Sequence, residues 1–129
     1  MSKKILTMEL LNGKYGVCRL DKTESIPEWA KESKFFSATK TSDEVSIVCD
    51  EDNIPNGIVA EKDWRILKII GPLDFSLIGI LSSVSTVLAQ KRISIFAIST
   101  YDTDYILVKN IDLDNALFAL TNEGYEVIK

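Results

Sequence analysis

The chain has 129 residues, of which 46% are hydrophobic and 26% charged, a composition that suits one average globular domain or two very small ones. Asp and Glu together number 19 against 15 Lys and Arg, and the net charge of −4 argues against nucleic acid as a partner. Histidine is absent, which removes the commonest general base and the commonest metal ligand, so we expect no catalytic residue, no metal site and no cofactor.

The apolar runs of the chain are interrupted by charge. Glu9 breaks the first run, and the run from Ile66 to Leu81 contains Lys68 and Asp74. Neither run predicts a signal peptide or a membrane anchor. We therefore expect a cytoplasmic protein without a membrane partner.

The first half of the chain predicts short strands and little helix. Asn12-Gly13 between apolar runs at 5–11 and 15–20 predicts a hairpin. Pro27 begins a helix of one or two turns at most. Two further strands, 35–39 and 44–49, are expected around a polar turn at 41–43, and 58–60 is expected as another strand.

The second half predicts two helices and four strands. A strand at 64–70 precedes a helix that opens near Asp74 or Ser76 and runs to about Lys91. The apolar stripe of that helix is Leu77, Leu81, Val84 and Leu88, and Gly79 within it is expected to be a close-packing point. Strands near 93–99 and 105–108 follow, then a helix from 113 to 120 between Asp112 and Gly124, then a strand at 125–128.

This order of elements is strand, helix, strand, strand, helix, strand. It predicts an α+β protein whose second half is a ferredoxin-like βαββαβ module with two helices on one face of an antiparallel sheet. The first half is expected to be a helix-poor variant of the second. We place the first module at 1–62 and the second at 63–129, with the boundary near Ala60 to Asp63.

Cys18 and Cys49 both fall in strand-like runs. Buried structural thiols are favoured there over a disulfide or a reactive pair.

Hydroxyl and carboxylate side chains gather in the turn at 99–104, between two apolar strands. The side chains of such a turn can cap their own hairpin, as Asp side chains often do, or they can bind a small polar ligand. Other uses of the ferredoxin-like fold fit poorly. An RNA-recognition domain needs a basic sheet with aromatics, a metal chaperone needs paired cysteines before the first helix, and an acylphosphatase needs an arginine there.

A family resemblance favours the ligand interpretation. The run from Ile98 to Val108, after Gly71-Pro-Leu-Asp-Phe-Ser-Leu-Ile-Gly-Ile80, resembles the ACT domains of the aspartokinase and CASTOR-type arginine-sensor group. It resembles most the small bacterial proteins built from two such domains. The resemblance covers about Trp64 to Lys129, and the first half matches in general layout only.

The resemblance implies a regulatory protein that binds an amino acid between modules and carries out no catalysis. By position, the ligand-binding residues would be Leu73, Asp74, Phe75, Ser76 and Leu77 at the helix start and Thr100, Tyr101 and Asp104 in the hairpin turn. Free N–H groups at a helix start suit an α-carboxylate, and Asp104 suits an α-ammonium.

Two of these residues have structural alternatives. Asp74 is favoured as a helix N-cap, and Leu77 also completes the apolar stripe. Arginine sensors of the resembling group carry an acidic residue where alignment places Leu77, so arginine is not carried over as the ligand.

We expect a homodimer, because four small modules side by side bury more apolar surface than two. A sensor without a catalytic domain must signal to a protein partner in trans. The alternative is an adaptor that binds a partner protein without any ligand. An enzyme is disfavoured, since no nucleophile–base pair or phosphate-binding loop is visible.

Overall fold

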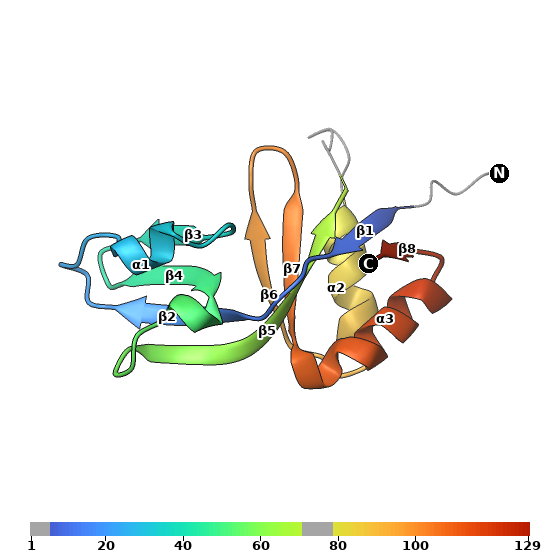
Figure 1. Ribbon diagram of the computed structural model, residues 1–129. Helices are drawn as coiled ribbons and strands as arrows, with labels where there is room; N and C mark the ends of the chain where they lie inside the picture. The colour runs from blue at the N-terminus through green and yellow to red at the C-terminus, as the bar shows by residue number, and fades with distance from the viewer. Residues whose placement is uncertain (1–5, 71–78) are drawn as a thin grey trace. The chain divides into compact units, whose positions relative to one another are not determined.

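The structure is a computed structural model that describes residues 6–70 and 79–129, and its chain divides into two compact units (Figure 1). One unit is Gly13–Trp64, and the other combines Met1–Asn12 with Arg65–Lys129. The expected boundary between 62 and 63 lies two residues from this division. The expected first module, however, also included the N-terminal strand, which the structure pairs within the second unit.

The Gly13–Trp64 unit is an antiparallel sheet with very little helix. Its elements are β2 (Tyr15–Leu20), α1 (Glu28–Lys31), β3 (Ser37–Lys40), β4 (Val45–Asp50), the 3-10 turn η1 (Glu51–Asn53) and the first half of β5 (Val59–Ile69). The strand order is β3-β4-β2-β5. This is the ferredoxin-like order, with α1 and η1 standing where that fold has its two helices, and the predicted helix-poor variant is confirmed.

One face of this sheet forms the core of the unit. The buried residues of the core are Cys18, Ala30, Val45, Ile47, Cys49 and Ile54. Both cysteines are free and buried, as expected. Contact with the Cys18 thiol and burial raise the pKa of Cys49, because a thiolate there would lie beside another sulfur in an apolar core. The pair therefore serves as packing.

The second unit has the complete ferredoxin-like set and one strand more. Its elements are β1 (Thr7–Leu10), the second half of β5, α2 (Ile80–Gln90), β6 (Ile95–Ser99), β7 (Asp104–Lys109), the 3-10 turn η2 (Asn110–Asp112), α3 (Leu113–Asn122) and β8 (Glu126–Ile128). The strand order is β6-β7-β5-β1-β8. The fold class is thus the predicted one, with β1 inserted between β5 and β8.

Both helices of this unit pack on the same face of its sheet. Alternate strand residues point to that face, because side chains of a strand alternate. The buried cluster consists of Met8, Leu67, Ile69, Val84, Leu88, Ile93, Ile106, Val108, Leu113, Ala116 and Leu120. Val84 and Leu88 belong to the predicted stripe of α2, so periodicity identified this helix face correctly.

The predicted hairpin at Asn12-Gly13 is wrong. β1 and β2 are both antiparallel to β5, β1 along its second half and β2 along its first half. The chain therefore keeps its direction through this dipeptide. Gly13 does adopt the positive φ, +91°, that favours glycine. Asn-Gly predicted the backbone conformation correctly, and the pairing partner differs because β5 outcompetes the local hairpin.

Two further predictions about element ends need correction. The strands expected at 58–60 and 64–70 are one continuous strand, β5. Gly79 does not lie inside a helix as a packing point. It occupies the N-cap of α2 with φ +83°, and a Cβ on it would meet nothing within 4 Å, so the backbone conformation explains the glycine.

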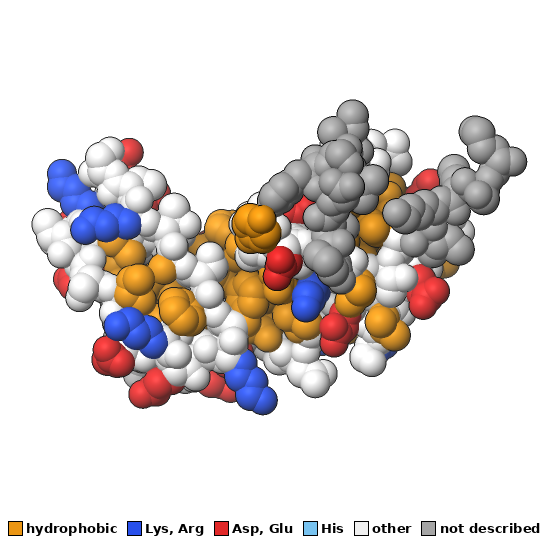
Figure 2. Space-filling view, turned by 90° about the horizontal axis from the view of Figure 1, so that it is seen from above, with side chains coloured by type: hydrophobic (Ala, Val, Ile, Leu, Met, Phe, Trp, Pro, Cys, Tyr) orange, Lys and Arg blue, Asp and Glu red, His pale blue; other side chains and the backbone are white. Residues whose placement is uncertain are grey.

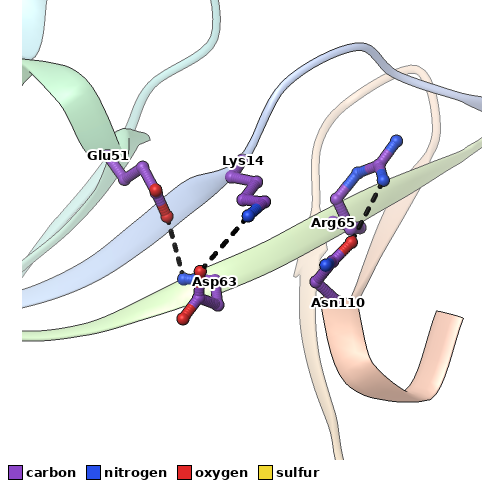
Figure 3. Close-up of polar contacts among 5 residues, drawn as sticks. All are labelled: Lys14, Glu51, Asp63, Arg65 and Asn110. Carbon is purple, nitrogen blue, oxygen red and sulfur yellow. Dashed lines mark hydrogen bonds and ion pairs between the residues drawn. The ribbon is translucent and has the colours of Figure 1, made fainter.

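A bulge in β5 is centred on Asp63. Between Tyr15 and Val17 of β2, the facing step on β5 is one residue longer, from Trp64 to Glu61. Asp63 has φ +66°, its N–H donates to Oε1 of Glu51 at 2.9 Å, and its carboxylate lies 3.7 Å from Nζ of Lys14 (Figure 3). The hydrogen bond from the Asp63 N–H to the Glu51 carboxylate holds the bulge more than the ion pair with Lys14 does.

The charges of the surface are mixed. On the face in Figure 2, Lys and Arg side chains of the described residues are scattered among Asp and Glu and form no single basic stripe. Among residues 6–70 and 79–129, no helix has the length and apolar character needed to cross a membrane.

The conformation of Asp63 predicts the effect of substituting it. Asp63→Val should lower the free energy of unfolding by about 1–3 kcal/mol, because a β-branched residue is strained at positive φ. Asp63→Gly should stay within about 0.5 kcal/mol of the original, since it keeps the N–H that Glu51 accepts. Urea unfolding measures both, and equal stability of the two variants would contradict the strained bulge.

Candidate ligand site at the β6–β7 turn

The turn between β6 and β7 is closed by backbone and side-chain hydrogen bonds of Thr100 and Thr103. The N–H of Thr100 donates to the carbonyl of Thr103 at 2.8 Å. The Thr100 hydroxyl donates to the same carbonyl at 3.0 Å and accepts from the N–H of Thr103 at 3.2 Å. Thr100 therefore closes the turn, and this hydroxyl fits the capping alternative that the sequence left open.

Asp104 is the first residue of β7 and pairs with Ser99, the last residue of β6. The Ser99 hydroxyl donates to Oδ1 of Asp104 at 2.5 Å. No side chain among the described residues donates to Oδ2, and Asp104 is only partly buried. One oxygen thus orients the carboxylate across the strand pair while the other can accept from a ligand.

Tyr101 is the most exposed of the predicted site residues in the turn. Its exposed fraction is 82%, and it follows Thr100 at the tip. A side chain with this much exposed surface can bury little of a ligand unless a second protein surface packs against it.

Thr103 is the residue that sequence reasoning missed. Its exposed fraction is 4%, and its hydroxyl donates to the carbonyl of Ile69 at 2.5 Å. This buried hydrogen bond fixes the turn to the end of β5, near the point where the expected facing segment begins. A threonine between two aspartates gives only a weak sequence signal, since hydroxyls in turns are usually exposed.

The other half of the predicted site is not placed. Leu73, Asp74, Phe75, Ser76 and Leu77 lie outside the described residues. The structure brings Thr100 and Asp104 together in one turn, with Tyr101 at its tip, and the opposing surface stays a prediction.

The first unit contains a similar turn that has no carboxylate at the position of Asp104. The N–H of Thr41 donates to the carbonyl of Glu44 at 2.9 Å, and the Thr41 hydroxyl accepts from the Glu44 N–H at 3.1 Å. Val45 occupies the position that corresponds to Asp104, and it is buried. The two modules thus share a threonine-closed hairpin, and a carboxylate at the first position of the second hairpin strand belongs to the second module alone.

Sequence comparison identifies the family. The sequence model of the ACT domain family matches residues 59–122, and a model described as an N-terminal domain matches residues 13–57. The chain belongs to the ACT domain family. Its ACT domain match starts at β5 and ends at α3, so it covers the part of the chain that carries the β6–β7 turn.

The curated relatives of this ACT protein are longer than it is. Human CASTOR3P is 36% identical over 103 residues, which is 70% of this chain and 63% of that protein. The bovine cytosolic arginine sensor for mTORC1 subunit 1 is 33% identical over 101 residues, which is 70% of this chain and 31% of that protein. The chain thus spans less than two thirds of the length of these relatives.

Solved structures share this fold. A crystal structure of an Agobacterium tumefaciens protein is 39% identical, covers 98% of this chain and 94% of its own, and gives a TM-score of 0.92. Aspartate kinase from Clostridium acetobutylicum, at 14% identity, covers 88% of this chain and 33% of its own with a TM-score of 0.66. The second similarity shows a shared fold alone.

The Thr103 hydrogen bond gives a test of how this ACT domain holds its turn. Thr103→Val should cost about 1–3 kcal/mol of unfolding free energy, because it leaves the buried Ile69 carbonyl without its donor. Thr103→Ser keeps the hydroxyl and is the matched control. Thermal and urea unfolding compare the two variants, and a valine variant as stable as the serine variant would show that the hydrogen bond contributes nothing.

Proposed function

We propose that this protein is a non-catalytic regulatory module that binds a free amino acid at the β6–β7 turn of its ACT domain. The observation that carries the proposal is the Asp104 carboxylate. Ser99 donates to one of its oxygens, and Thr103 fixes the turn that presents it. No side chain among the described residues donates to the other oxygen, which can accept from a ligand donor. A ligand α-ammonium is such a donor.

The ligand carboxylate requires a second surface. In the proposal the N–H groups of residues 73–77 bind it, with Thr100 and Tyr101 closing the site from the turn. Charge-assisted hydrogen bonds contribute roughly 1.5–3 kcal/mol each. Two or three of them, less the cost of ordering, correspond to dissociation constants of about micromolar to millimolar, which suits the sensing of a metabolite pool.

The names of the relatives support an amino acid as the ligand class and leave its identity open. The bovine relative is named as an arginine sensor. We do not carry arginine over, because Leu77 stands where the resembling sensors have an acidic residue for the guanidinium. A ligand with an uncharged side chain fits Leu77 better than arginine does.

The protein is proposed to act as a cytoplasmic homodimer that reports ligand binding to a protein partner in trans. No catalytic role is assigned to any residue.

The alternative proposal is an adaptor that binds its partner without a ligand. The Thr100 hydroxyl favours it, since that group is engaged within the turn. Partner capture with and without added amino acids separates the two proposals, because only a sensor changes its capture when the ligand is added.

Asp104→Asn tests the site. Calorimetric titration against the twenty amino acids should first identify a ligand of the unmodified protein. The substitution should then weaken that ligand by on the order of ten- to a hundredfold, since a charge-assisted bond becomes a neutral one.

The matched control is Asp43→Asn in the corresponding turn of the first module, which should leave the affinity unchanged. Circular dichroism checks that both variants are folded. The sensor proposal fails if no amino acid binds, and the site assignment fails if Asp104→Asn binds as tightly as Asp43→Asn.

A further inference from the structure

Arg65 carries a positive charge that the described part of the chain does not neutralise. Its Nη1 donates to Oδ1 of Asn110 at 3.2 Å (Figure 3), and no carboxylate of the described residues forms an ion pair with its guanidinium. Its Nε is buried and has no hydrogen-bond partner among those residues. A buried donor of a charged group is costly to leave unbonded, so it indicates an occupant such as an ion or a water molecule.

The contact with Asn110 orients the guanidinium and leaves one of its edges open. Asn110 binds the Nη1 arm, whereas Nε and Nη2 form the edge on the other side of the group. Nη2 is not among the buried atoms, and in Figure 3 the arm without a dashed line points away from Asn110. The two N–H groups of this edge are parallel, which is the geometry with which arginine binds both oxygens of a planar oxyanion.

This edge lies at the end of the second unit that is remote from the β6–β7 turn. Near Arg65, the N–H of Leu11 donates to the carbonyl of Ile66, whereas Thr103 of the turn donates to the carbonyl of Ile69. Residues 65 and 69 are about 13 Å apart along an extended strand. Arg65 is therefore separate from the candidate amino-acid site.

The charge at this edge selects the class of anion. Arg65 lies on the face of β5 that carries the buried Leu67, whereas Lys109 lies on the face of β7 opposite the buried Val108. Because Leu67 and Val108 belong to one buried cluster, Arg65 and Lys109 point to opposite faces of the sheet. A single guanidinium balances the one charge of a carboxylate, whereas a phosphate group carries about two charges at pH 7.

We propose that Arg65 binds the carboxylate of a small organic acid, with Nε and Nη2 donating in parallel to its two oxygens. Asn110 is a positioning residue that holds the guanidinium by its third nitrogen. The site goes beyond the proposed amino-acid site, because it uses other residues and requires no α-ammonium on the ligand.

The Nε–H signal of Arg65 in proton–nitrogen NMR spectra of the full chain reports on the site directly. Arg65→Lys identifies the signal by removing it. Sodium acetate, exchanged for sodium chloride at constant ionic strength, should shift the signal downfield and reach saturation, with a dissociation constant on the order of 1 mM. Inorganic phosphate at the same ionic strength should bind more weakly than acetate.

Asn110→Asp should move two measurements in opposite directions. The new carboxylate lies against the guanidinium and takes the place of the ligand charge, so the melting temperature should rise. For the same reason the affinity for acetate should fall by about tenfold or more.

Asn115→Asp is the matched control for this substitution. It adds the same charge in the first turn of α3, where the helix dipole stabilises it, and Asn115 is exposed. Its affinity for acetate should stay within about threefold of the original, because it leaves the Arg65–Asn110 contact in place. Any rise in melting temperature that both variants share belongs to the helix dipole.

Arg65→Gln removes the charge itself and is followed by melting temperature, since the Nε–H signal is lost. Acetate in large excess over its dissociation constant should stabilise the unmodified chain and leave this variant unaffected, because only a bound ligand stabilises the folded state. Arg19→Gln is the matched control. It removes an exposed arginine of the first unit, whose Nη2 donates to the Asp43 carbonyl, and it should keep the stabilisation by acetate.

The proposal is overturned if acetate leaves the Nε–H signal in place or shifts it without saturation, or if Asn110→Asp binds acetate as tightly as Asn115→Asp. The assignment to carboxylates is overturned if phosphate binds more tightly than acetate. Asp104→Asn should leave acetate binding unchanged. An amino-acid titration that fails while these results hold would therefore remove the sensor proposal and leave the Arg65 site intact.

Discussion

The fold depends on the length of β5, an eleven-residue strand that serves both units. Its first half belongs to the first unit and pairs with β2, and its second half belongs to the second unit and pairs with β1. The bulge at Asp63 lies in the first half of this strand, where it faces β2. The hydrogen bond from the Asp63 N–H to the Glu51 side chain is a local contact that holds this bulge.

Periodicity predicted the parts of the fold whose signals are local. The stripe of α2 named Val84 and Leu88, both fully buried, and Asp112 and Gly124 correctly bracket α3. Asn12-Gly13 shows the limit of prediction from local sequence signals. The dipeptide gives a local backbone preference, whereas the choice of partner for β1 depends on pairing with β5 and β8, which are distant in sequence. The sequence did not predict β5 as one continuous strand for a related reason. A charged stretch within a strand has the same composition as a loop.

The position of the candidate site could be predicted from the sequence, whereas the role of each residue within it could be predicted less well. Hydroxyls and carboxylates at the end of two apolar strands identified the β6–β7 turn, and the family resemblance selected an amino-acid ligand for it. The different roles of the residues in the turn became clear only from the structure. Thr100 is engaged in closing the turn, Asp104 is oriented by Ser99, and the buried Thr103 was overlooked because its acceptor, the Ile69 carbonyl, belongs to a strand thirty-four residues away.

The insertion of β1 between β5 and β8 affects how the protein can be dissected. Cutting the chain at residue 63 to isolate its ACT domain would remove β1, take the buried Met8 out of the core, and leave β8 without the strand it pairs with. Such a fragment would expose two new sheet edges and should aggregate. A usable minimal ACT domain therefore has to be a rearranged chain, with residues 6–12 attached by a linker after β8. In this protein the two modules are separable in architecture but interleaved in sequence.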